Sequence, residues 1–151
     1  MLVKGEYGIQ RSKAMDTVLI KQETIRSIEF IGAKNNKSNY LDRILSLFES
    51  QAGSILSQVE DALFHCDTKR VLQLAHTLKG SALCIGAMKL AENCADLEDF
   101  IRSEGKNEFS YTSNNQICPS MDMLAEKIAS TRIVYQQTID ELRPFISKNH
   151  S

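Results

Sequence analysis

The fold is decided by the stretch Leu41-Asp-Arg-Ile-Leu-Ser-Leu-Phe-Glu-Ser-Gln-Ala-Gly-Ser-Ile-Leu-Ser-Gln-Val-Glu-Asp-Ala-Leu63. Its apolar side chains recur every three or four residues, at Leu41, Ile44, Leu45, Phe48, Ala52, Ile55, Val59 and Leu63. Residues with this spacing share one face of an α-helix, so the stretch is predicted to be a long amphipathic helix. Ser38 or Asn39 is predicted to cap its start, and Gly53 costs about 1 kcal/mol relative to alanine, which a helix of this length tolerates.

Weaker helical patterns precede and follow this stretch. Asp16–Ile31 is predicted to form a short first helix that stops at Gly32 and is followed by a loop over Ala33–Lys37. His65–Thr68 is predicted to be a turn, with Asp67 as the N-cap of the next helix. That helix contains the motif Ala75-His-Thr-Leu-Lys-Gly-Ser81.

Two more helices are expected in the second half of the chain. The first runs from Ala87 to Arg102 and ends at Gly105, with Leu90, Cys94, Leu97 and Ile101 facing inward. The second is capped by Ser120 and is interrupted or kinked at Pro144, with Met121, Leu124, Ile128, Tyr135, Ile139 and Leu142 facing inward. Between them, residues 106–119 are rich in Asn, Ser and Thr and are predicted to be a mobile loop.

These patterns predict an all-α protein, an antiparallel four-helix bundle with an additional short N-terminal helix. No window shows the apolar alternation of a strand, and there is no internal repeat. A chain of 151 residues forms one ordinary domain, so residues 16–151 are assigned to the bundle and residues 1–15 to a flexible arm.

Composition narrows the classes of function. The net charge of −1 gives no reason to expect a nucleic-acid partner, and no run approaches the roughly 18 apolar residues of a membrane span. The N-terminus lacks the apolar region of a secretory signal, so the protein is expected in the cytoplasm, or in the nucleus as well if the source is a eukaryote. It is also expected to be a monomer. The four cysteines, which lack C-x-x-C spacing, are expected to be reduced thiols: Cys66, Cys84, Cys94 and Cys118.

Helical geometry turns His76 away from the core. The residues that fall together on the core face are Val71, Leu74, Ala75, Leu78, Ala82 and Ile85, whereas His76 lies beside Gly80 on the outer side, with Lys79 exposed on its flank. Leu72 and Leu83 share that outer side. They either form a docking surface or pack against a neighbouring helix.

The residue types of His-x-x-Lys-Gly suit phosphoryl chemistry. An imidazole nitrogen is a nucleophile near neutral pH, and an ammonium group one turn away can bind phosphoryl oxygens. A glycine leaves no side chain over the reacting atom, so another protein can approach closely. The alternative is an ordinary surface histidine beside a solvated lysine.

The segment Ala75-His-Thr-Leu-Lys-Gly-Ser-Ala82, followed by Ile85-Gly-Ala87, closely resembles the signature of the histidine-containing phosphotransfer (HPt) domain of two-component phosphorelays. The similarity extends more weakly from Thr17 to Ile146. It implies a four-helix bundle in which His76 accepts phosphate, Lys79 supports the phosphate and Glu98 orients the imidazole. Gly80 would admit the partner, and the docking surface would comprise Leu72, Gln73, Gly80, Ser81 and Leu83. The alternative interpretation is that Glu98 is an ordinary glutamate whose carboxylate is solvated.

The resemblance also implies the partners and the reaction. A phosphorelay intermediate accepts the phosphoryl group from the aspartate of a receiver domain and passes it to another response regulator. Receiver domains and a hybrid sensor histidine kinase are therefore the expected partners, and magnesium is expected in the receiver, with no cofactor or metal in this chain. The chain has no Gly-rich ATP-binding motif, so it is expected to be a phosphocarrier and not an enzyme.

Three other functions are also considered for a helical chain of this kind. A helical adaptor or inhibitor could bind a receiver or kinase without carrying phosphate. A metal-dependent bundle hydrolase would need a Glu-x-x-His pair on a core face, which the sequence lacks. A histidine-bearing dimerisation domain of a kinase would normally precede an ATP-binding domain. A free-standing phosphorelay carrier is the leading interpretation.

Overall fold

The computed structural model describes residues 17–107 and 119–150, and all regular secondary structure within those ranges is α-helical. The predicted arm over residues 1–15 lies outside the described residues, as do Cys118 and most of the predicted loop over 106–119. Cys66, Cys84 and Cys94 are free thiols, as expected. No helix within the described ranges combines the length and the apolarity needed to cross a membrane.

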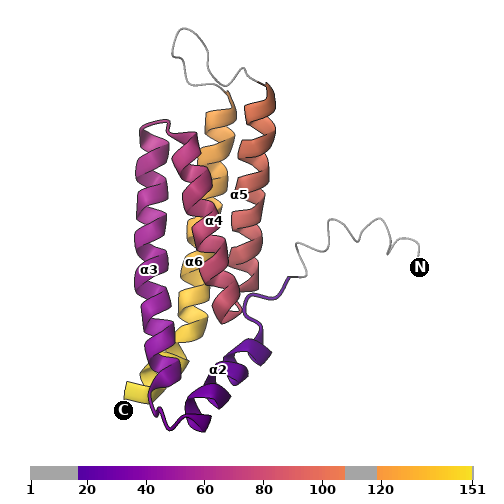
Figure 1. The fold of residues 1–151 in the computed structure, drawn as a ribbon. Coiled ribbons are helices and arrows are strands. Elements are labelled where there is room, and N and C mark those ends of the chain that lie inside the picture. Colours follow the sequence, from indigo (N-terminus) through magenta and orange to yellow (C-terminus); the bar gives the residue numbers. More distant parts are fainter. Residues whose placement is uncertain (1–16, 108–118, 151) are drawn as a thin grey trace, which may run out of the picture.

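Four long helices lie side by side and a shorter one lies across one end of them (Figure 1). The short helix is α2 (Gln22–Lys34), and the long ones are α3 (Tyr40–Phe64), α4 (Thr68–Ile85), α5 (Met88–Asn107) and α6 (Pro119–His150). Each long helix runs opposite to the one before it, and α3 and α5 both contact α4 and α6. This arrangement confirms the predicted antiparallel four-helix bundle with an additional N-terminal helix.

The predicted bounds of α2 were wrong at both ends. The helix begins at Gln22 instead of Asp16 and continues past Gly32 to Lys34. Gly32 is buried against the first turn of α3, where a Cβ atom on Gly32 would lie 2.6 Å from the Cβ of Tyr40. The glycine therefore allows two helices to approach closely, and the chain turns later, at Asn36, which has a φ of 59°.

Helix α3 buries most of the apolar face that its sequence predicts, including Leu41 and Leu45, whereas the predicted Ile44, Ile55 and Leu63 are only half-buried. Asn39 occupies the N-cap position, but its side chain makes no capping hydrogen bond. Gly53 has a role in packing, because a Cβ atom there would lie 2.9 Å from the hydroxyl of Tyr135 in α6. That hydroxyl donates a hydrogen bond to the carbonyl of Glu49 (2.9 Å), which joins α3 to α6.

Both ends of α4 are fixed by local interactions. The Arg70 N–H donates to Oδ1 of Asp67 (3.1 Å), which confirms the predicted N-cap. The six buried residues of α4 are those predicted to face the core: Val71, Leu74, Ala75, Leu78, Ala82 and Ile85. The helix ends at Gly86, whose φ of 80° is in the left-handed region that glycine adopts without steric cost.

Helices α5 and α6 are longer than predicted. Helix α5 continues through Gly105 to Asn107, because a single glycine weakens a helix by about 1 kcal/mol without ending it. Helix α6 begins at Pro119, so Ser120 lies within its first turn and does not precede it as a cap. Proline suits this position because the first turn needs no backbone donor. Further along, α6 continues through Pro144, so the predicted interruption there was wrong, whereas the alternative of a kink stays a prediction.

The turn between α4 and α5 also anchors α2. The Lys21 N–H donates to the Gly86 carbonyl (2.8 Å), and a Cβ atom on Gly86 would lie 2.7 Å from the Cβ of Thr24. Gly86 is therefore required both by its own backbone conformation and by the close approach of the chain around α2. The result is that α2 covers the end of the bundle at which α4 and α5 meet (Figure 1).

We predict that Gly86→Ala destabilises the protein, because a left-handed residue with a side chain costs roughly 1–2 kcal/mol before the contact with Thr24 is counted. Gly80→Ala is the matched control. Gly80 lies inside α4 with no atom within 4 Å of an added Cβ, so alanine there should stabilise the helix by up to about 1 kcal/mol. Urea unfolding of both variants measures the difference. A Gly86→Ala protein as stable as the wild type would contradict this account of the turn.

Candidate functional site

His76 lies in the middle of α4 with its ring facing solvent. Its side chain is 68% exposed, whereas its neighbour Ala75 is buried in the core. The capped start of α4 and its buried stripe fix the rotation of the helix about its own axis. The structure therefore places the imidazole on the outer surface, as predicted.

Glu98 of α5 contacts the imidazole ring at its Nδ1 atom. Its Oε2 is 2.7 Å from Nδ1 of His76, and its side chain is only 2% exposed. An ionised carboxylate only accepts hydrogen bonds, so the proton of this bond belongs to Nδ1. In the neutral ring the other nitrogen, Nε2, then carries an unprotonated lone pair and is the nucleophilic atom.

Lys79 binds the other oxygen of the same carboxylate, with Nζ 2.6 Å from Oε1 of Glu98. Its side chain is 30% exposed, so the expectation of an exposed lysine was wrong. The ion pair holds the ammonium group down against α5, one turn along α4 from His76. His76, Lys79 and Glu98 therefore form a single connected cluster at the seam between α4 and α5.

A fourth residue, Arg102, belongs to this cluster and was missed in the sequence. Its Nη2 lies 3.7 Å from Oε2 of Glu98, and its side chain is 55% exposed. The two residues are four positions apart on α5, a spacing at which acidic and basic side chains of a helix meet. That spacing is the signal in the sequence that could have identified Arg102.

The hydrogen bonds from Lys79 and His76 keep the carboxyl group of Glu98 ionised. Burial alone would raise the pKa of its carboxyl group, but the hydrogen bonds from Lys79 and His76 outweigh burial and lower that pKa below its ordinary value. Glu98 is therefore ionised at neutral pH. One turn earlier on α5, burial and then the charge of Glu98 raise the pKa of the Cys94 thiol to about 12, so Cys94 is neutral.

The surface beside His76 is open at Gly80 and partly apolar. No atom lies within 4 Å of a Cβ added at Gly80, and Leu83 is 49% exposed. Leu72 is only partly accessible and packs against the core cluster that contains Val59 and Val71. The two leucines therefore differ: Leu83 is exposed and available to a partner, whereas Leu72 packs against neighbouring helices. Gln73 is exposed and Ser81 is half-buried.

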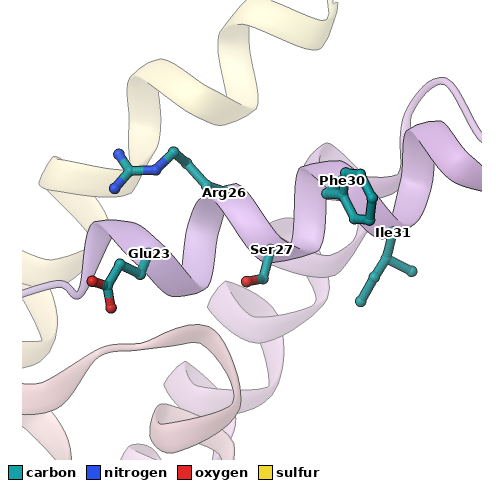
Figure 2. Close-up of a pocket in the computed structure, with 5 residues that line it drawn as sticks. All are labelled: Glu23, Arg26, Ser27, Phe30 and Ile31. Atoms are coloured by element: carbon teal, nitrogen blue, oxygen red, sulfur yellow. The ribbon is translucent and has the colours of Figure 1, made fainter.

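A separate hollow lies on α2 and is lined by Glu23, Arg26, Ser27, Phe30 and Ile31 (Figure 2). Phe30 and Ile31 are exposed large apolar side chains on this short helix. All five lining residues come from α2, whereas the His76 cluster comes from α4 and α5. Among the residues that the structure describes, no three His, Cys, Asp or Glu side chains are grouped as ligands for a metal ion.

Comparisons with known proteins show the family of this chain and agree with its fold. The model of the Hpt domain family matches residues 43–142, more than half of the chain. The crystal structure of yeast Ypd1p aligns with a TM-score of 0.71 at 18% identity, covering 86% of this chain and 95% of that chain. A rice protein described as a histidine-containing phosphotransfer protein aligns with a TM-score of 0.54 at 14% identity, covering 99% and 97%. At these identities the two structures show a shared fold. No curated protein sequence gives a significant match.

We predict that Glu98 makes stability depend on pH in the acidic range. Its pKa is lowered in the folded state, whereas in the unfolded chain it is about 4.3, so the unfolded state binds more protons in the interval between the two values. The stabilisation is present above the unfolded pKa and is lost as the pH falls through the folded one. Urea unfolding between pH 6 and pH 3 should show a steeper loss for the wild type than for Glu98→Gln. Parallel profiles would contradict the lowered pKa.

Proposed function

This chain belongs to the Hpt domain family, and from that premise we propose that it is a phosphorelay intermediate whose phospho-accepting atom is Nε2 of His76. Membership of the family assigns the chain a phosphotransfer role in two-component signalling. The observation that carries the proposal for His76 is the 2.7 Å bond from Nδ1 to Glu98, because it leaves the exposed nitrogen of the ring as the nucleophile.

The proposed reaction transfers a phosphoryl group between two side chains. The lone pair of Nε2 attacks the phosphorus of an aspartyl phosphate on a receiver domain, so that an N–P bond forms and the P–O bond to the aspartate breaks. The electron pair of that P–O bond returns to the aspartate carboxylate. Because the ring keeps the proton on Nδ1, it becomes positively charged, and the carboxylate of Glu98 stabilises that charge. The reverse steps pass the group to a second response regulator.

Lys79 supplies positive charge on the same surface as the nucleophile. Its side chain is 30% exposed, so phosphoryl oxygens on Nε2 can be attracted to its ammonium group while that group remains near Glu98. Gly80 leaves room for the partner's active site above the ring, and Leu83 offers apolar contact area two turns further along α4. These features support docking of a receiver domain, whether it is free or part of a hybrid sensor histidine kinase.

The proposal divides the chemistry between two proteins. This chain provides a positioned nucleophile and a charged, open surface. The receiver domain provides the aspartate, its acidic pocket and the magnesium ion that phosphoryl transfer requires. The chain is therefore proposed to act as a phosphocarrier whose reaction is completed in the complex.

We predict that the wild-type protein, incubated with a phosphorylated receiver domain, acquires acid-labile phosphate and that His76→Gln acquires none above background. The glutamine variant removes the nucleophile and leaves the core face of α4 unchanged. Mass spectrometry locates the label among His65, His76 and His150. Labelling of His76→Gln equal to that of the wild type would exclude His76. Tight binding without transfer by either protein would instead favour an adaptor or inhibitor.

We predict that Gly80→Gln slows transfer from the receiver by about tenfold or more, because every 1.4 kcal/mol of steric cost in the complex is a factor of ten in rate. The nucleophile itself is untouched, so the small donor phosphoramidate should label Gly80→Gln at the wild-type rate and serves as the internal control. Unchanged transfer from the receiver would show that the open space at Gly80 is not used by the partner.

A further inference from the structure

We propose that the groove between α5 and α6 is a docking site for an amphipathic helix of a relay partner that carries lysine or arginine along one edge. The identity of that partner rests on the proposed function, and the groove adds to it a second interaction surface. This surface lies outside the cluster of His76, Lys79 and Glu98, so both can be engaged at the same time.

The groove lies where α5 and α6 pack side by side (Figure 1). It has a volume of about 700 Å³, which is within the range of ligand-binding pockets. Its apolar part consists of Ala95, Ile133 and Val134. Ile133 is 58% exposed, although most of the residues around it in the groove are charged or polar. An amphipathic helix can bury its apolar face in a groove of this kind.

The α5 edge of the groove carries an acidic stripe, formed by Glu92, Asp96 and Asp99. Their spacing of four and then three residues places these side chains above one another on the helix surface. Asp96 is paired with Lys127 of α6 at 3.2 Å, and Glu92 accepts a hydrogen bond from Thr17 at 2.5 Å. Asp99 is exposed and has no ion pair within the described residues. The stripe therefore keeps negative charge that this part of the chain does not neutralise.

The difference between the two edges indicates what the groove binds. The α6 edge contributes Ser130 and Gln137, and the residues of α6 that line the groove carry no charge. A helix seated there would bring its basic side chains to the α5 edge and its apolar side chains to Ile133, so it would match the groove in charge and in hydrophobicity. Lys89, at the opposite end of the α5 edge from Asp99, suits the negative C-terminal end of such a helix.

A metal ion is a less suitable counter-charge for this stripe. Among the described residues, no three His, Cys, Asp or Glu side chains are grouped as ligands for one ion. The three carboxylates are instead distributed over about two turns of α5, roughly 11 Å along its axis. Several cations spaced along a partner helix fit this distribution.

The acidic stripe faces away from the seam that holds His76. At about 100° per residue, its three carboxylates lie roughly 100–160° around the axis of α5 from Glu98, which contacts α4. A helix bound in the groove therefore leaves His76 and Gly80 open. A partner that carries both this helix and a receiver domain would hold the receiver at a high effective concentration near the imidazole.

The experiment uses a synthetic helical peptide with leucine along one face and lysine along one edge of that face. A peptide with glutamate in place of lysine is the control ligand. Asp99→Lys and Ile133→Ser change the charge and the apolar contact of the groove. Asp61→Lys and Leu47→Ser are the matched control variants, because they change an exposed carboxylate and an exposed apolar side chain of α3. Calorimetry measures the affinity for the full chain, and ¹H–¹⁵N NMR locates the peptide.

The lysine peptide is expected to bind the wild type and both control variants equally, with NMR shift changes along the groove and none at Gly80. Asp99→Lys and Ile133→Ser are each expected to weaken binding about fivefold or more, and added salt should weaken it further. The glutamate peptide should not bind. Equal affinity for all five proteins, or shift changes at Gly80, would overturn the proposal.

Two other occupants of the groove would give different results. A second copy of the chain could insert its exposed α2 face, which carries Arg26 and Phe30. Self-association of the wild type that both Phe30→Ser and Ile133→Ser abolish would identify that copy as the occupant and overturn the proposal. If the chain's own N-terminal residues bound in the groove, the double variant Arg11→Glu, Lys13→Glu would bind the lysine peptide more tightly than the wild type. That result would also overturn it.

Phosphoryl transfer separates this inference from the proposed function. A receiver domain joined to the lysine peptide by a flexible linker is expected to phosphorylate the wild type about tenfold faster, or more, than the receiver alone. Ile133→Ser should remove that gain and keep the wild-type rate with the receiver alone. Normal transfer with no gain from the peptide would overturn the inference and leave the proposed function standing. Peptide binding without transfer from either receiver would count against the proposed function itself.

Discussion

The hydrogen bond between Glu98 and His76 is the interaction on which the site depends. It crosses from α5 to α4, so it exists only if the two helices are packed in one register and at one rotation. A carboxylate as buried as that of Glu98 is stable only when its lone pairs are matched by donors. Lys79 and His76 satisfy that requirement on the outer side, and Arg102 adds a positive charge 3.7 Å from Oε2.

The rest of the fold serves to hold α4 and α5 in this arrangement. Asp67 sets the start of α4, and the left-handed turn at Gly86 sets its end. The buried stripe of α4 then leaves His76 no direction except outward, and α2 secures the turn at Gly86 through Lys21 and Thr24. A bundle held together by apolar packing thus positions a polar cluster on its surface. The proposed phosphoryl transfer needs no cavity in this chain.

Much of this arrangement could be predicted from the sequence, because helical periodicity depends on local spacing. The pattern around Leu74 and Leu78 placed the core face of α4 correctly and turned His76 outward. Glycines were harder to interpret, since Gly32 allows a close approach to Tyr40 and Gly105 lies within α5. The half-buried state of Lys79 and the packing of Leu72 depend on neighbouring helices, which spacing along one helix does not reveal. Placing Glu98 against the ring needed both the family resemblance and its register on α5.

The proposed role of His76 depends on which nitrogen of its ring carries the proton. That question can be answered directly by ¹⁵N NMR of the histidine-labelled, unphosphorylated protein at a pH at which the ring is neutral. We expect Nδ1 to be protonated and Nε2 to be unprotonated, because the carboxylate of Glu98 lies 2.7 Å from Nδ1. A ring found with its proton on Nε2, or exchanging evenly between the two nitrogens, would contradict the claim that Glu98 prepares Nε2 as the phospho-accepting atom.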